Sequence, residues 1–220
     1  MREEPVIGFL PDGRRLHMRD GPIELIIEAF GTLDQVKIAY IAAAHRFDGL
    51  LAELVEELAL LRAPVSEAVP QGVIARRMHE AVSPFAIDGF ITPMAAVAGS
   101  VAEEILAAMT RAADLRRAYV NNGGDIAIHL GKGESFAIGL IDRPDRPGLF
   151  GKAKIAWNER SRGIATSGWR GRSFSLGIAD AVTVIAETAS MADAAATMIA
   201  NRVDLPGHPA ITRELASSIQ

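Results

Sequence analysis

The chain has 220 residues, of which 49% are hydrophobic and 23% charged, so it can bury a sizeable core and is not a disordered protein. Its 23 basic and 27 acidic residues give a formal net charge of -4, which argues against a general nucleic-acid-binding protein. The chain contains no cysteine, which excludes thiol nucleophiles, thiolate metal sites and disulfides.

The start of the sequence carries no targeting signal that we recognise. Residues 1–5 include two glutamates and lack the charged and then apolar order of a signal peptide. No run approaches the roughly 18 apolar residues that a membrane span requires. We therefore expect a soluble, cytoplasmic protein that forms a single domain over residues 1–220, with no membrane partner and no nucleic-acid partner.

The first third of the chain predicts two strands followed by helices. Apolar runs at residues 6–10 and 23–29 are bounded by Pro- and Gly-containing turns, as strands are. Thr32, followed three residues later by Gln35, predicts a helix start with a capping box. Apolar residues at spacings of three and four then predict one long helix that ends by Leu61, before Pro64. A shorter helix is expected over residues 73–81.

A second helix start follows at Thr92 and Pro93. The residues after it are nearly all small, so another backbone or a flat ligand could come close; tight packing against a helix or sheet is the simpler explanation. Strands are then expected at residues 119–120, 126–130, 136–141, 154–157, 163–166 and 182–186, and a small-residue helix at 190–201. Because strands and helices do not alternate regularly, this pattern indicates an α+β fold.

Asp193 and Thr197 lie four residues apart, on one face of the last predicted helix. A carboxylate and a hydroxyl among small residues suit a hard cation such as Mg²⁺ with a phosphate-bearing ligand. A purely structural reading is also open. Ser190 and Asp193 have the spacing of a capping box, in which Asp193 would serve only the start of its own helix.

Two further segments could bind a ligand. The paired glycines of residues 121–125 expose backbone N–H groups that a phosphate or flat ring could use, but Asn-Gly is also an ordinary hairpin signal. Arginines flank residues 166–168, and their guanidinium forks suit phosphate oxygens, although solvated charges on a strand explain them as well. These arginines are Arg160, Arg162, Arg170 and Arg172.

Taken in order, four segments resemble the C-terminal half of the ApbE family, the Mg²⁺-dependent FAD:protein FMN transferases. They are residues 121–126, 136–139, 163–168 and 192–197. The chain is most similar to the UPF0280 group of ApbE-like proteins, because residues 21–25, 92–99 and 179–184 resemble segments of that group. With these segments the resemblance covers most of the chain.

The resemblance implies an ApbE-like, T-fold-related α+β architecture with a mixed sheet and packed helices. It implies that Asp193 and Thr197 occupy Mg²⁺-ligand positions. The ligand would be a small molecule: FAD or another flavin, a nucleotide or a pterin. The residues implied to bind it are Asn121, Gly123, Gly124, Asp125, Thr166, Ser167, Gly168, Arg172 and Asp180.

The chain also departs from the family. Flavin transferases carry a functionally important histidine in a His-Ile-Asp-Pro-like segment, whereas the corresponding residues 169–180 contain no histidine. FMN transfer to a protein is therefore not expected. Two hypotheses follow: a transferase-related enzyme that makes or modifies a cofactor, or a non-catalytic ligand-binding module. The position of Asp180 distinguishes the two hypotheses: a carboxylate beside Asp193 favours the enzyme, and a carboxylate turned to solvent favours the binding module. The oligomeric state, a homo-oligomer included, is left open.

Overall fold

A computed structural model describes residues 4–141, 149–170 and 175–213. A seven-stranded sheet has the order β1-β2-β3-β4-β5-β8-β9, and β6 and β7 form a separate two-stranded sheet. The strands of the large sheet are β1 (Val6–Phe9), β2 (Leu16–Asp20), β3 (Ile23–Phe30), β4 (Arg117–Asn122), β5 (Asp125–Leu130), β8 (Gly163–Ser167) and β9 (Val182–Ala186). The smaller sheet contains β6 (Ser135–Ile141) and β7 (Leu149–Ala156).

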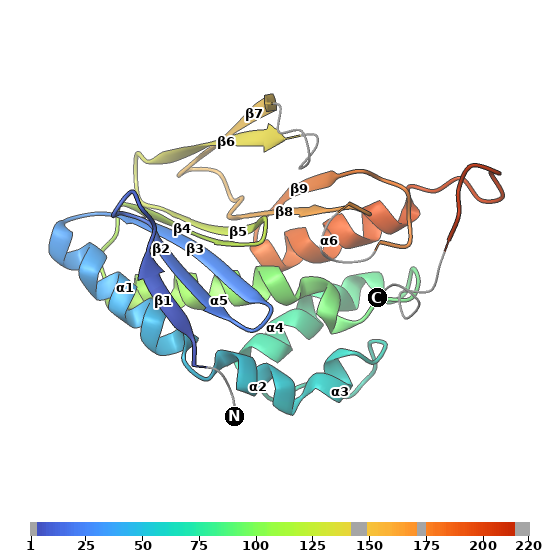
Figure 1. Ribbon diagram of the computed structural model, residues 1–220, viewed down its shortest axis with the longest axis horizontal. Coiled ribbons are helices and arrows are strands. Elements are labelled where there is room, and N and C mark those ends of the chain that lie inside the picture. The colour runs from blue at the N-terminus through green and yellow to red at the C-terminus, as the bar shows by residue number, and fades with distance from the viewer. Residues whose placement is uncertain (1–3, 142–148, 171–174, 214–220) are drawn as a thin grey trace.

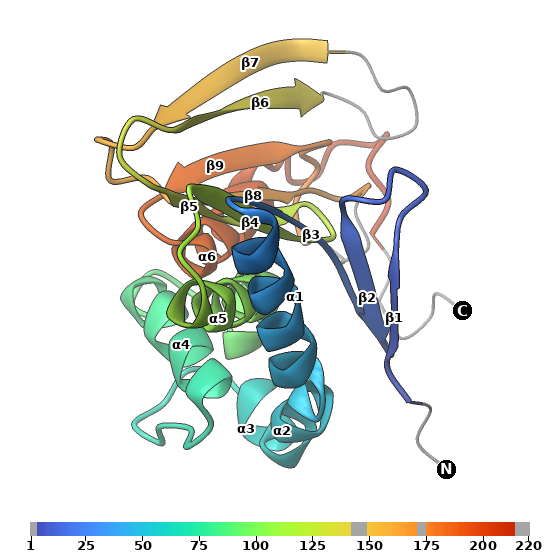
Figure 2. The same cartoon turned by 90° about the vertical axis from the view of Figure 1, so that its left-hand side faces the viewer.

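Helices cover one face of the large sheet and the β6–β7 hairpin covers part of the other (Figures 1 and 2). The helices are α1 (Leu33–Phe47), α2 (Leu50–Glu56), α3 (Leu58–Leu61), α4 (Val73–Val82), α5 (Val97–Ala112) and α6 (Ala189–Arg202), with short 3₁₀ turns η1 (Ser83–Phe85) and η2 (Pro93–Ala96). Figure 2 shows the layers from the side, with α5 and α6 directly under the sheet. The predicted α+β class is confirmed, but every pairing among the described strands is antiparallel, where a mixed sheet was expected.

The alternation of side chains in β3 explains how the core forms. Ile23, Leu25, Ile27 and Ala29 are buried, and the residues between them are only partly buried. Because successive side chains of a strand point to opposite faces, this strand presents one apolar face to the helices. The main core cluster accordingly joins β2, β3, β4 and β5 to α1, α4 and α5.

The predicted helix ends and strands are largely confirmed, with two corrections. Thr32 caps α1, and its side chain accepts a hydrogen bond from the Gln35 backbone N–H at 3.4 Å. The single long helix to Leu61 is wrong: the chain breaks at Gly49, whose φ of 77° is unfavourable for other residues, and continues as α2 and α3. Strand β2 was not predicted, because it is short and includes a buried aspartate, Asp20.

Most of the small residues at the start of α5 and in α6 are buried, as the sequence predicts. In α6, six of the buried residues are alanine or serine at positions 189, 190, 192, 194, 196 and 200. The start of α5 differs in detail from the prediction: Pro93 opens a 3₁₀ turn, and the Thr92 side chain makes no capping hydrogen bond. The two helices therefore pack closely, and this packing determines which residues reach the candidate site.

Candidate functional site

Two glycines allow the first turn of α6 to lie between α5 and β8. A Cβ atom on Gly99 would lie 2.3 Å from the backbone oxygen of Ala189. A Cβ atom on Gly163 would lie 2.1 Å from the backbone carbon and oxygen of Thr188. Real Cβ atoms essentially never come so close, so both positions require glycine for this packing. The contact places the beginning of α6 beside the beginning of α5.

Asp193 uses this contact to cap α5 rather than its own helix. The side chain is 9% exposed, and its Oδ2 accepts a hydrogen bond from the Gly99 backbone N–H at 3.0 Å. The residue at the N-cap of α5 is Ala96, which has no side chain that can accept this hydrogen bond. Helix α6 is capped by Thr188, which accepts from the Met191 N–H at 3.2 Å. The alternative of a Ser190–Asp193 capping box is therefore wrong.

Asp125 contributes a second carboxylate near Asp193. Its Oδ1 accepts a hydrogen bond from the Thr166 backbone N–H at 3.1 Å, which joins the start of β5 to β8. The pKa of Asp193 lies well above its ordinary value, first because the side chain is buried and second because Asp125 is negatively charged. The backbone N–H groups of Gly99 and Ala98 oppose this shift. We call these two residues the Asp125–Asp193 centre; a cation bound between them would relieve their repulsion.

The segment of residues 121–125 is a hairpin turn that is fixed to the start of α5. Gly123 and Gly124 have φ values of 65° and 116°, which favour glycine. Asn121 Oδ1 accepts from the Gly124 N–H at 2.8 Å, and Asn122 Nδ2 donates to the Ala98 backbone oxygen at 3.2 Å. The prediction that Asn-Gly marks an ordinary hairpin turn is thus confirmed, and the turn is followed directly by Asp125.

Residues 166–168 lie beside Asp125, which accepts from the Thr166 N–H. The Thr166 hydroxyl is 2.9 Å from the Thr183 hydroxyl of β9, so it forms a cross-strand pair. Ala165 packs against Ala192 and Ala196 of α6. By strand alternation, Ser167 shares this helix-facing side of β8.

Thr197 lies one turn beyond Asp193 on α6 and is half-buried. Within the described ranges its side chain makes no hydrogen bond to another residue. Asn201, another turn along, holds the loop before β9 instead: its Oδ1 accepts from the Leu176 N–H at 2.8 Å.

Asp180 is an exposed carboxylate that holds Trp169 and Arg170. Its side chain is 58% exposed, and Oδ1 accepts from Trp169 Nε1 at 3.1 Å and from Arg170 Nε at 2.7 Å. Gly168 packs against the backbone of Asp180, since a Cβ there would lie 2.3 Å from its oxygen. An exposed carboxylate is the outcome that favours a binding module over an enzyme. Arg172 lies outside the described residues.

Clusters of three or more His, Asp or Glu side chains that could hold a metal are absent from residues 4–141, 149–170 and 175–213, the surroundings of Asp125 and Asp193 included. An open hollow of about 470 Å³ is lined by residues that include Thr32, Asp114 and Lys132. It lies at the end of β4 and β5 opposite the Asn121–Asp125 turn. A cation at the Asp125–Asp193 centre would therefore use two carboxylates together with hydroxyl or backbone oxygens.

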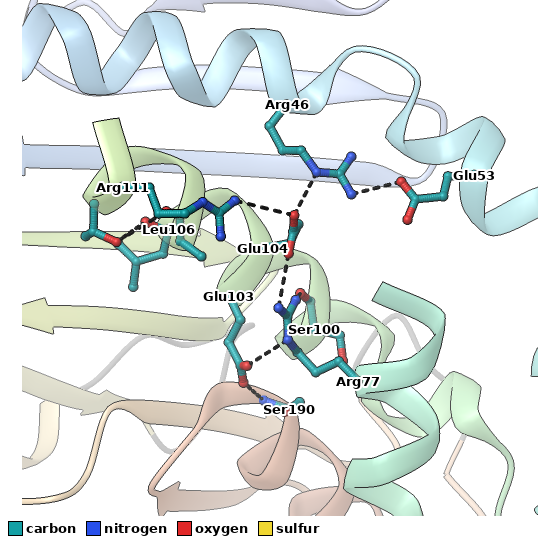
Figure 3. Close-up of polar contacts among 11 residues, drawn as sticks. Arg46, Glu53, Arg77, Ser100, Glu103, Glu104, Leu106, Arg111 and Ser190 are labelled. Atoms are coloured by element: carbon teal, nitrogen blue, oxygen red, sulfur yellow. Dashed lines mark hydrogen bonds and ion pairs between the residues drawn. The ribbon is translucent and has the colours of Figure 1, made fainter. Parts of the chain in front are cut away.

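Sequence reasoning missed the polar network that supports α5 (Figure 3). Glu104 is 4% exposed and accepts from Arg46 of α1 at 2.8 Å and from Arg77 of α4 at 3.0 Å. Burial would raise the pKa of Glu104, but the hydrogen bonds from both arginines outweigh it and lower that pKa. Glu103 accepts from the Ser190 N–H at 2.6 Å and so ties α5 to the start of α6. Two adjacent glutamates in a small-residue helix were the only signal, and their partners lie far away in sequence.

The helices that the structure describes include none with the length and apolar character needed to cross a membrane.

Comparison with known proteins identifies relatives of this chain. The family model described as AbpE bacteria matches residues 7–220. A UPF0280 protein of Methanopyrus kandleri is 43% identical over 136 residues, which are 61% of this chain and 50% of that protein.

Two further relatives have the same name and similar coverage. UPF0280 proteins of Methanosphaerula palustris and Methanosarcina barkeri are 38% and 35% identical over 138 and 141 residues. These matches cover 58% and 60% of this chain, and 53% and 49% of those proteins. The chain thus spans about half the length of the curated relatives it matches. On the match over residues 7–220, the chain belongs to the ApbE-like family described as AbpE bacteria.

Proposed function

We propose that this protein binds a divalent cation, Mg²⁺ by preference, at the Asp125–Asp193 centre, together with a flavin- or nucleotide-like small molecule. The observation that carries the proposal is the pair of carboxylates from distant segments, one of them buried with a raised pKa. Asp125 raises the pKa of the buried Asp193, so a positive charge bound near both carboxylates would be favoured. Oxygen ligands suit Mg²⁺, which also keeps waters and binds phosphate oxygens.

The surrounding residues fit such a cation. Asp193 Oδ2 accepts from the Gly99 N–H, and a carboxylate offers about four lone-pair sites, so the group can bind a metal as well. Thr197 adds a hydroxyl on the same face of α6, one turn further along. The ApbE-like resemblance assigns the metal to these two α6 residues, and Asp125 is the addition that their surroundings support.

The ligand's phosphates would then lie near the Gly123–Gly124 turn and Ser167. The Gly123 backbone N–H and the Ser167 hydroxyl are donors that suit phosphate oxygens, whereas the Gly124 N–H already donates to Asn121 Oδ1. Mg²⁺ bound to a pyrophosphate would hold it and polarise it. The chain's own residues would bind and orient the molecule.

A second candidate function is a binding module without catalysis, and the exposed Asp180 favours it. Transfer of FMN to a protein also needs a group that activates the attacking hydroxyl, and residues 169–180 contain no histidine for that role. We therefore propose ligand binding as the common activity, with cofactor synthesis or modification as the enzymatic form of it.

The test is a thermal-shift panel of FAD, FMN, ATP and a pterin, each with Mg²⁺ or with EDTA. A ligand at 100 times its dissociation constant should stabilise the protein by about 2.7 kcal/mol. We expect one class to stabilise the protein only with Mg²⁺, and Asp193→Asn to remove the effect. Asp48→Asn, an exposed aspartate at the end of α1, is the control that should keep it. No Mg²⁺-dependent shift with any ligand would overturn the proposal.

A further inference from the structure

The loop after β8 holds an exposed tryptophan in a fixed orientation. Trp169 is 49% exposed, and its indole N–H donates to Asp180 Oδ1 at 3.1 Å. The Arg170 guanidinium lies 4.5 Å from the ring centroid and donates to the same carboxylate oxygen. We call Trp169, Arg170 and Asp180 the Trp169 platform.

The backbone below the ring is fixed as well. The Trp169 N–H donates to the Ala179 backbone oxygen at 3.0 Å, and Gly168 packs directly on the Asp180 backbone. The ring therefore stays in place although half of its surface is open to solvent. The other tryptophan, Trp157, is 42% exposed but makes no indole hydrogen bond or ring stack with another described residue. Exposure alone thus does not explain why Trp169 is held by three contacts.

The geometry of the platform suits a flat ring. Arg170 covers one face of the indole, and about half of the residue is still exposed to solvent. Asp180 neutralises the guanidinium and satisfies the indole N–H, so a stacked ring would not leave a buried charge without a partner. An aromatic side chain whose orientation is already fixed loses little entropy when a ring stacks on it.

The platform is also close to the candidate ligand site. Only Ser167 and Gly168 separate Trp169 from Thr166, whose N–H binds Asp125. Successive residues of an extended chain advance by about 3.3 Å, so three residues span roughly 10 Å. That distance is comparable to the length of a nucleotide from its phosphate to its base. We propose that Trp169 stacks on the planar ring of a ligand whose phosphates bind at the Asp125–Asp193 centre; this inference rests on the proposed function. The platform selects for flavin, purine or pterin rings over ringless phosphates.

The experiment compares a probe with a ring to one without. FAD and inorganic pyrophosphate are each titrated with Mg²⁺ into the wild type, Trp169→Ala, Trp169→Phe and Trp157→Ala by isothermal titration calorimetry. Loss of aromatic stacking should weaken FAD binding by about 5- to 150-fold in Trp169→Ala and leave pyrophosphate binding unchanged. Trp169→Phe keeps a ring face and should retain most of the FAD affinity. Trp157→Ala, the matched control, should bind both probes as the wild type does.

A second measurement covers the case in which Trp169→Ala fails to fold. The chain has two tryptophans, so the indole N–H signal of Trp169 in a ¹⁵N NMR spectrum is the one missing from Trp169→Phe. FAD should shift this signal through its ring current, and pyrophosphate should not. The inference is overturned if FAD binds the wild type but neither moves this signal nor loses affinity in Trp169→Ala. It is also overturned if Trp169→Ala weakens the binding of pyrophosphate as much as that of FAD, because Trp169 would then support the whole site. If neither probe binds the wild type with Mg²⁺, the proposed function fails and this inference fails with it.

Discussion

The packing of α5 against α6 should be sensitive to one methyl group at Gly99. The Cβ atom of Gly99→Ala would lie 2.3, 2.5 and 2.7 Å from backbone atoms of Ala189 and Ser190, and ordinary contact begins at 3.4 Å. No flexible side chain can move aside, so the helices must separate by about 1 Å. This separation stretches the 3.0 Å hydrogen bond between the Gly99 N–H and Asp193 beyond hydrogen-bonding range.

The expected magnitude combines two opposing effects. Overpacking a tight contact costs about 1–3 kcal/mol, and more where backbone atoms collide. Alanine has a higher helix propensity than glycine, which returns up to about 1 kcal/mol in α5. We therefore expect Gly99→Ala to lower the free energy of unfolding by about 1–3 kcal/mol in urea denaturation. Gly8→Ala, which meets no atom within 4 Å, should change it by less than about 0.5 kcal/mol. If Gly99→Ala is as stable as the wild type or more stable, the close approach of α5 and α6 is wrong.

Three further predictions concern Asp193, Glu104 and the transfer of FMN. Because the pKa of Asp193 is raised in the folded state, the folded protein binds that proton more tightly than the unfolded chain, and without divalent cations its free energy of unfolding should fall as pH rises from about 3.9 through the raised pKa. Asp193→Asn should flatten this dependence in denaturation curves measured across pH. Glu104→Gln should lower the free energy of unfolding by about 2 kcal/mol, which is less than the roughly 3–5 kcal/mol of a fully buried ion pair because Arg46 and Arg77 are still 23% and 24% exposed. The exposed control Glu67→Gln should leave the free energy of unfolding unchanged, and equal denaturation curves for the two variants would contradict the network. A mixture of FAD, Mg²⁺ and a threonine-bearing acceptor protein should show background flavinylation only, and robust labelling of the acceptor would refute that expectation.

The parts of the fold that the sequence predicts are those with local causes. Thr32 caps α1 through the N–H of Gln35, three residues along, and the apolar run at residues 23–29 between turns marks a strand without reference to other segments. The break of the long helix at Gly49 was missed because apolar spacing continues across it. Strand β2 depends on pairing with β1 and β3 on both sides, which a five-residue stretch does not reveal.

The sequence could suggest which residues belong to the candidate site, but it could not show which groups those residues contact. The spacing of Asp193 and Thr197 was visible in the sequence, but the partner of Asp193 is a backbone N–H 94 residues away. The capping-box alternative failed for the same reason, since tertiary packing gave the carboxylate a different helix to cap. Asp125 was selected for its place in a resemblance, whereas its effect on Asp193 follows from the pairing of β5 with β8.

The most direct test of the central claim is Mg²⁺ binding itself. Mg²⁺ is titrated by calorimetry into the wild type, Asp193→Asn, Asp125→Asn and the control Asp48→Asn. Asparagine keeps an oxygen that can accept from the Gly99 N–H, so Asp193→Asn removes the charge while the cap of α5 is retained. We expect one Mg²⁺ per chain in the wild type and the control, and loss of binding in both centre variants. Unchanged Mg²⁺ binding in Asp193→Asn would contradict the claim, and Asp193 would then serve only as the cap of α5.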